Sequence, residues 1–251
     1  MRADFTLLPR RVHGATIKSF RRRLLHWFDM AGRDFPWRAR NATTYLQVLT
    51  ELLVQQTRAE SVAAVLPRIV RRYPSWRSLA GAKIRELERV LKPLGLWRRR
   101  ARAIKNLAIA LKARNWEWPI ERDELEALPA VGQYVASAVR IFIHDQREPL
   151  VDVNMARVLE RHFGPRALAD IRHDPWLQSL ARRVVAEDDP RLVNWAVLDF
   201  GAIVCTPRNP LCLECPLRRS CVYYTGAAKG IVAQRVIGVG GRSRKSPRSR
   251  T

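Results

Sequence analysis

All four cysteines of the chain lie in one short segment. Cys205, Cys212, Cys215 and Cys221 occur in the run CTPRNPLCLECPLRRSC, with the spacing C-x6-C-x2-C-x5-C. No distant cysteine is left to cross-link the fold by a disulfide. Four thiolates this close together can ligate a tetrahedral zinc ion or a four-iron, four-sulfur cluster, and ligand chemistry alone does not choose between them. The alternative without a metal is a set of four buried free cysteines.

Two further segments carry groups that could bind or react. Asp152, in VDVNMARV, directly precedes a helical pattern, so it is expected to cap that helix by accepting hydrogen bonds from its first amides. The segment LPAVGQYVASAV joins two helical patterns through a tight turn, in which Gly132 is expected to adopt unusual backbone angles. Amides that open a helix bind phosphate without reading sequence, so Ala130, Val131 and Gly132 are candidate contacts to a polyanion. The alternative is an ordinary helical corner.

Helices must position these groups, because apolar residues recur at helical spacing and strand-like alternation is nearly absent. The helical patterns cover residues 20–28, 45–57, 63–73, 84–95, 103–113, 134–143 and 155–164. Proline and glycine break the chain at Pro36, Pro74, 93–95, 118–119, 129–132, 164–165 and Pro190. The sequence therefore predicts a mainly α fold of short helices joined by tight turns.

The charge of the chain indicates a polyanionic partner. Its 46 Lys and Arg against 23 Asp and Glu give a formal net charge of +23. Nucleic acid is the expected partner, while a membrane surface or an acidic protein would also attract such a chain. The sequence has no apolar run of signal-peptide or membrane-spanning length, so we expect an intracellular protein. From Gly226 onward Gly, Ser, Arg and Lys predict a disordered basic tail, either a solvated end or a DNA tether.

Taken in order, the hairpin, the D-x-N-x-x-R-V segment at Asp152 and the cysteine spacing resemble the helix-hairpin-helix DNA glycosylases. The resemblance is to the endonuclease III and MutY branch and covers residues 18–224. It implies an all-α fold of two lobes with a DNA groove between them. A six-helix barrel would span residues 45–152, and residues 18–44 and 153–224 would form the lobe that holds the cysteines. An N-terminal extension (1–17) and the basic tail (225–251) would flank them.

The same resemblance favours a [4Fe-4S] cluster on the four cysteines over zinc. The cluster would support the fold and position DNA, with no redox step in hydrolysis. Arg208, in the cysteine segment, would contact phosphate.

Catalytic roles also follow from the resemblance. Asp152 would face a nucleotide flipped out of the duplex and stabilise the positive charge that develops on its sugar as the base departs. Glu51 would lie in the base pocket as an acid or water-orienting group. Gln56, with Gln55 as the second choice, would fill the gap left in the duplex. For Glu51, Gln55 and Gln56 the alternative is a solvated helix face.

The substrate follows from departures within the family. Tyr134 stands where lyase-type members carry a nucleophilic lysine, which predicts a monofunctional enzyme. Tyr134 also resembles the thymine mismatch enzymes, and Leu96-Trp97 replaces the tyrosine pair of adenine glycosylases. We therefore expect a monomer that removes thymine or uracil opposite guanine from mismatched double-stranded DNA. The alternatives are a MutY-like adenine glycosylase acting opposite guanine or oxidised guanine, and a catalytically silent DNA-binding module.

Overall fold

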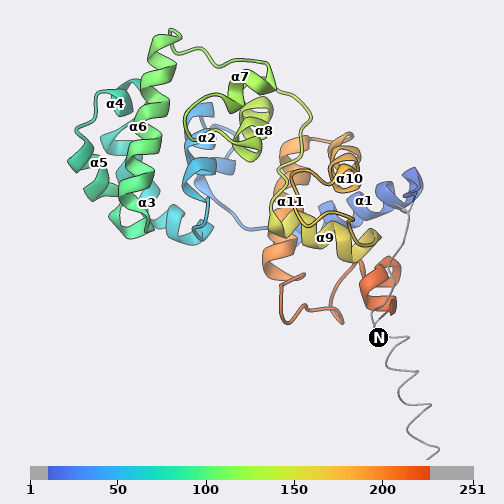
Figure 1. The fold of residues 1–251 in the computed structure, drawn as a ribbon. Helices are drawn as coiled ribbons and strands as arrows, with labels where there is room; N and C mark the ends of the chain where they lie inside the picture. Colours follow the sequence, from blue (N-terminus) through green and yellow to red (C-terminus); the bar gives the residue numbers. More distant parts are fainter. Residues whose placement is uncertain (1–10, 227–251) are drawn as a thin grey trace, which may run out of the picture.

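The computed structural model describes residues 11–226, and within that range helices are joined by turns and loops and no strand is present (Figure 1). The helices are α1 (Gly14–Ala31), α2 (Thr44–Leu53), α3 (Ala59–Arg72), α4 (Trp76–Ala80), α5 (Ile84–Leu91), α6 (Trp97–Ala113), α7 (Arg122–Glu126), α8 (Gln133–Phe142), α9 (Val153–Phe163), α10 (Pro175–Val185) and α11 (Pro190–Ile203). Three short 3-10 turns cover Pro36–Arg38, Lys92–Leu94 and Arg218–Ser220. The all-α prediction is confirmed.

Buried apolar side chains form two separate cores. The first draws on α2 to α8, and in Figure 1 these helices gather on one side of the molecule. The second lies between α1, α9, α10 and α11, so the first helix of the chain packs among the last three. The boundaries proposed for the two lobes stay a prediction. The expected tail from residue 227 onward and residues 1–10 of the N-terminal extension lie outside the described residues.

Helix α11 belongs to both cores. Its Trp195 packs in the first core, whereas Val197 and Phe200 pack in the second. Helices α10 and α11 were not among the helical patterns identified in the sequence. Each starts at an Asp-Pro pair, in which the aspartate side chain caps the helix and the proline occupies its first turn. Pro190 therefore begins a helix, whereas the sequence interpretation treated it only as a break.

Helix α2 ends earlier than its apolar pattern predicts. The pattern ran from residue 45 to 57, but the helix stops at Leu53 and the backbone of Gln56 is left-handed, with φ of 56°. The buried guanidinium of Arg100 explains the difference. It donates to the carbonyls of Leu52 at 3.0 Å and Leu53 at 2.7 Å, and to that of Gln55 at 3.1 Å. These bonds satisfy the carbonyl groups that a helix end leaves unpaired.

The hairpin before α8 differs from the sequence prediction in its backbone. Gly132 is extended, with φ of −99° and ψ of −176°, and the left-handed residue is Ala130, with φ of 64°. The expectation for Gly132 was therefore wrong. The amide of Val131 is also not free, because it donates to the carbonyl of Leu128 at 3.1 Å and closes the turn. A Cβ atom at Gly132 would meet no protein atom within 4 Å, so its backbone is open to approach from outside.

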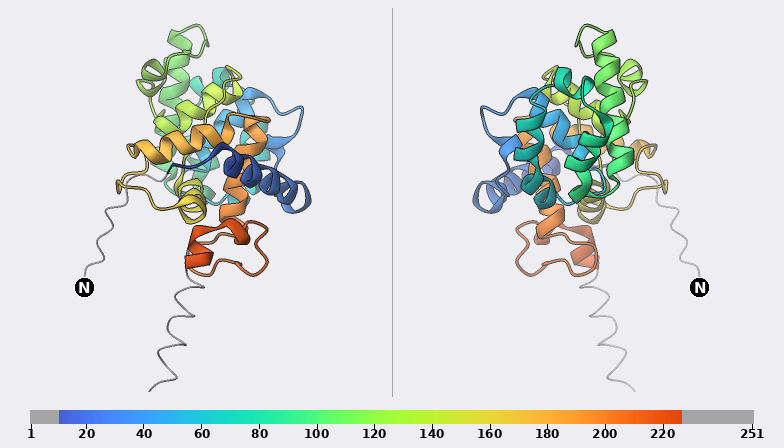
Figure 2. Two further views of the ribbon diagram at one scale, coloured as in Figure 1. Left: turned by 90° about the vertical axis from the view of Figure 1, so that its right-hand side faces the viewer. Right: turned by 90° about the vertical axis from the view of Figure 1, so that its left-hand side faces the viewer.

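The segment of four cysteines follows α11 and extends from the end of that helix, as both views in Figure 2 show. Between Cys205 and Cys221 only Leu217 is buried. No helix in residues 11–226 is long and apolar enough to cross a membrane.

Candidate active site and cysteine pocket

A groove of about 1020 Å³ runs along the boundary between the two cores. Its walls come from the α2–α3 connection and the start of α8 on one side, and from α9 and α11 on the other. Glu51, Tyr134 and Asp152, which the sequence interpretation assigned to catalysis, all line this groove. They come from α2, α8 and the N-cap of α9, so the fold brings together residues that are separated by up to 101 positions in the chain.

A buried Glu51 is hydrogen-bonded to a half-buried Tyr134. The Tyr134 hydroxyl donates to Oε2 of Glu51 at 2.8 Å, and only 4% of Glu51 is exposed. Burial disfavours the charged carboxylate and raises the pKa of Glu51 to about 7, although the Tyr134 bond and the positive charge of Arg38 act against that rise. Burial likewise raises the pKa of Tyr134 well above its ordinary value, so its hydroxyl keeps its proton. Glu51 can therefore hold or release a proton near neutral pH.

Asp152 caps α9, as its position in the sequence predicted. Its Oδ1 accepts from the amides of Asn154 and Met155, each at 2.8 Å, and its Oδ2 accepts from the side-chain amide of Asn154 at 2.7 Å. Burial raises the pKa of Asp152, and these three bonds oppose the rise because they favour the carboxylate. The capping role does not remove Asp152 from the groove, which it also lines.

Hydrogen bonds connect Asp152 to the start of the cysteine segment. Asn154, bonded to Asp152, accepts through Oδ1 from Arg157 at 2.7 Å. Arg157 also donates to the carbonyls of Gly201 at 2.7 Å and Cys205 at 2.8 Å. A Cβ atom at Gly201 would lie 2.8 Å from the Asn154 Cβ, so α9 and α11 approach closely here because residue 201 is a glycine.

A charge cluster to which the sequence assigned no role lies beside the groove, with two arginines that line it. The Asp199 carboxylate, whose side chain is 0% exposed, pairs with Arg33 at 2.6 Å and with Arg38 at 2.8 Å. The Arg38 guanidinium lies 5.4 Å from the centre of the Trp195 ring and 5.0 Å from that of Phe35. Arg38 ends the segment DFPWR, whereas Asp199 lies on α11, which the apolar pattern did not identify.

The remaining candidate DNA contacts occupy different places. Gln55 and Gln56 line the groove on the turn that follows α2, and so does Gly132. Ala130 is exposed on the hairpin beside them, outside the groove lining. Arg208 is exposed on the cysteine segment and is not part of the groove wall.

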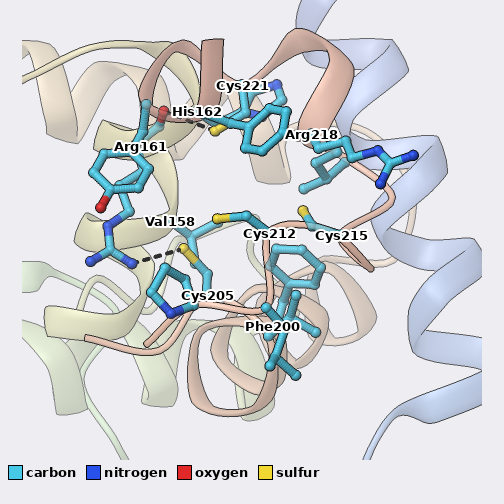
Figure 3. A pocket seen from close by; sticks show the side chains of 15 residues that line it. Val158, Arg161, His162, Phe200, Cys205, Cys212, Cys215, Arg218 and Cys221 are labelled. Carbon is cyan, nitrogen blue, oxygen red and sulfur yellow. Dashed lines mark hydrogen bonds between the residues drawn. The ribbon is translucent and has the colours of Figure 1, made fainter. Parts of the chain in front are cut away.

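The four cysteines line one pocket at the far side of α9 and α11. Figure 3 shows their sulfur atoms around one space, with Arg161 beside them. None of the four is in a disulfide. Among residues 11–226, no group of three or more His, Cys, Asp and Glu side chains is close enough to hold a single metal ion.

His162 gives the pocket a second unusual feature. Only 3% of this residue is exposed, and neither ring nitrogen has a hydrogen-bond partner within the described part of the chain. Burial lowers its pKa to about 4, so the ring is neutral and one nitrogen carries a proton. A buried donor without an acceptor is costly in free energy. Four free thiols and an unpaired ring donor therefore fit a sulfur-rich, negatively charged group in this pocket.

An all-helical fold with a hairpin, a buried and a half-buried carboxyl group at one groove, and a four-cysteine loop is the architecture of a base-excision repair protein. Residues 49–173 match the HhH-GPD superfamily of base excision DNA repair proteins, and residues 205–221 match the iron-sulfur binding domain of endonuclease III. The chain belongs to the HhH-GPD superfamily.

Relatives of known name agree with this assignment. The chain is 38% identical over 213 residues to a thymine-DNA glycosylase of Aeropyrum pernix, covering 83% of this chain and 95% of that one. It is 37% identical to a thymine/uracil-DNA glycosylase of Pyrobaculum aerophilum, covering 87% and 96%. The solved structure of a thermostable thymine-DNA glycosylase superposes with a TM-score of 0.78 at 29% identity, covering 84% and 98%.

Adenine DNA glycosylases are similar as well. The protein of Rattus norvegicus is 31% identical over 227 residues, which cover 86% of this chain but only 44% of that protein.

Proposed function

We propose that this protein is a monofunctional DNA glycosylase that hydrolyses the bond between deoxyribose and a thymine or uracil mispaired with guanine. The observation that carries the proposal is the Tyr134 hydroxyl bonded at 2.8 Å to a buried Glu51, in the same groove as Asp152. Full-length similarity to thymine and thymine/uracil glycosylases supports the choice of base.

Two carboxyl groups divide the chemistry in this proposal. Asp152 stabilises the positive charge that develops on the sugar, because its capping bonds hold the carboxylate in place and favour its charged form. Glu51, with a pKa of about 7, is suited to protonate the departing base or to orient water near neutral pH.

Tyr134 supports hydrolysis rather than lyase chemistry. Its hydroxyl stays protonated and is engaged by Glu51, so no amine is available at this position to form a Schiff base with the opened sugar. The aromatic ring can pack against the flipped nucleotide while the hydroxyl holds the Glu51 carboxyl group.

DNA binding rests on the groove and its surroundings. The open backbone at Gly132 and the first amides of α8 provide a phosphate contact without sequence preference, with Ala130 beside them. Gln56 would fill the space of an extruded nucleotide, with Gln55 as the second choice, and the position of both residues on the groove wall supports this role. We expect Arg208 to contact phosphate from the cysteine segment, and the protein to act as an intracellular monomer.

We further propose that Cys205, Cys212, Cys215 and Cys221 hold a [4Fe-4S] cluster. The match of residues 205–221 to an iron-sulfur binding domain and the unpaired donor of His162 support this cofactor. The cluster would order the exposed loop that carries Arg208, and the hydrolysis would use no electron from it.

A single-turnover assay tests the function. Duplexes carrying T·G, U·G, A·G or adenine opposite oxidised guanine are incubated with excess protein, and alkali-labile sites are counted. Cleavage of T·G and U·G is expected. Preference for adenine would make the protein a MutY-like enzyme. The similarity to adenine glycosylases is the reason for including these duplexes. A shifted duplex without any alkali-labile site would identify a silent DNA-binding module.

A further inference from the structure

Arg161, on the last turn of α9, holds the start of the cysteine segment. Its guanidinium donates to the carbonyl of Thr206 at 2.7 Å and to that of Pro207 at 2.8 Å. The same group lies 3.5 Å from Sγ of Cys205 and donates to it, as the dashed line in Figure 3 shows. Two nitrogens of one side chain thus make three hydrogen bonds to three consecutive residues, beginning with the first cysteine.

The same arginine also reaches the end of the segment. Its guanidinium lies 4.8 Å from the centre of the Tyr223 ring, two residues after the last cysteine. Its backbone carbonyl accepts from the Cys221 thiol at 3.2 Å. Ligation would remove that thiol proton, so the stacking on Tyr223 is the contact that persists when Cys221 binds a metal.

Other contacts reach single points of this segment. Arg23 donates to the carbonyl of Pro216 at 3.5 Å. Cys205 and Cys215 pack against the second core. Leu217 is its one buried residue, and Leu211 and Leu213 are exposed. Arg157 bonds the carbonyl of Cys205, but it contacts no residue at the other end of the segment among the described hydrogen bonds. Arg161 is therefore the side chain that joins the first and last parts of the loop.

We propose that Arg161 is a positioning residue that clasps the two ends of the cysteine loop and stabilises an iron-sulfur cluster within it. The inference rests on the proposed cofactor. A hydrogen bond to a ligand sulfur, together with a nearby positive charge, favours the more electron-rich state of a cluster and so raises its reduction potential. The planar guanidinium can donate to the sulfur and to both carbonyl oxygens at once from two nitrogens. A lysine ammonium has its donors on one nitrogen and cannot reproduce this geometry.

The test compares Arg161→Met and Arg161→Lys with wild type and with a matched control, Arg166→Met. Arg166 lies in the same lobe and also binds two backbone carbonyls, those of Leu168 and Ala169, but touches none of the cysteine segment. Iron per chain is measured after anaerobic purification. The rate at which visible absorbance is lost in air and the reduction potential by protein-film voltammetry are then recorded.

Arg161→Met is expected to lose its cluster roughly 10- to 100-fold faster than wild type, the usual effect of removing a partner of a metal ligand. The reduction potential of Arg161→Met should fall below that of wild type. Arg161→Lys should be intermediate in both cluster-loss rate and potential, and Arg166→Met should match wild type in both. If Arg161→Met does not fold, the lysine variant decides by the same measurements. If the Arg161 variants lose their visible absorbance at the wild-type rate and keep the wild-type reduction potential, the positioning role of Arg161 is wrong. Colourless wild-type protein would instead overturn the cofactor itself.

Discussion

The groove and the cysteine pocket are built in opposite ways. The groove residues stand on or beside helices that pack into the two cores. Helix packing and hydrogen bonds from groups on these helices therefore fix the Glu51 and Asp152 carboxyl groups. The cysteine pocket is closed on one side by a loop with a single buried residue, held by guanidinium bonds to backbone carbonyls. The difference indicates that the chemistry of the groove is preorganised by the fold, whereas the pocket depends on what its thiols bind.

The largest expected effect is that of Asp152→Asn on the groove. Asparagine caps a helix as well as aspartate does, so α9 and the fold should be retained. Loss of the negative charge should reduce base excision by about 1000-fold or more, because the charge acts when the sugar becomes cationic. Single-turnover excision and the affinity for a mismatched duplex are measured together. An equal loss of affinity and rate would show that Asp152 serves mainly the structure.

The second expected effect is confined to the pocket. Cys212→Ser removes one of four ligands and should lower the iron content and the affinity for DNA, while far-ultraviolet circular dichroism stays close to that of wild type. Cys212 belongs to neither core, so its replacement should change the iron content without changing the helical structure. Unchanged iron content in this variant would contradict the ligand assignment. Zinc in the wild type would contradict the cluster.

A third test uses the proton affinity of Glu51. Its pKa in the folded protein, about 7, is raised above the ordinary 4.5, so the folded state binds more protons between these values and stability falls as pH rises through that window. Glu51→Gln should therefore stabilise the protein at pH 8 by on the order of 3 kcal/mol, and by almost nothing at pH 4. Thermal unfolding at the two pH values measures the difference. An equal change in melting temperature at pH 4 and pH 8 would mean that the pKa of Glu51 is not raised in the folded protein.

The same variant reports on the leaving base. If Glu51 protonates it, Glu51→Gln should slow excision strongly, and wild-type activity should decline as pH rises through about 7. A mild effect would favour thymine, whose ring carries the departing negative charge better.

The smallest expected effect is a gain of chemistry at Tyr134. Tyr134→Lys should place an amine in the groove next to Glu51, and a minor fraction of the protein should form a covalent complex with DNA that borohydride traps. Wild type should form none. Trapping of wild-type protein would end the monofunctional assignment. A lysine variant that removes bases but never traps would show that residue 134 does not face the sugar.

The sequence was sufficient for features defined by local chemistry. The helix cap at Asp152 and the clustering of the cysteines follow from residue type and spacing, and both are present. The end of α2 was missed because Arg100, 47 residues beyond Leu53, decides it. Asp199 was missed for a similar reason, since its partners Arg33 and Arg38 lie more than 160 positions away. Such pairs leave no periodic signal along the chain.

The position of α11 in both cores has a consequence for how the molecule comes apart. One helix completes two packed interiors and forms part of the wall between them, so opening either interior exposes apolar surface in the other. The two halves should then melt in one cooperative transition rather than as independent units. A protease cut near Pro190 would therefore unfold both cores at once, and the groove between them would be lost as well.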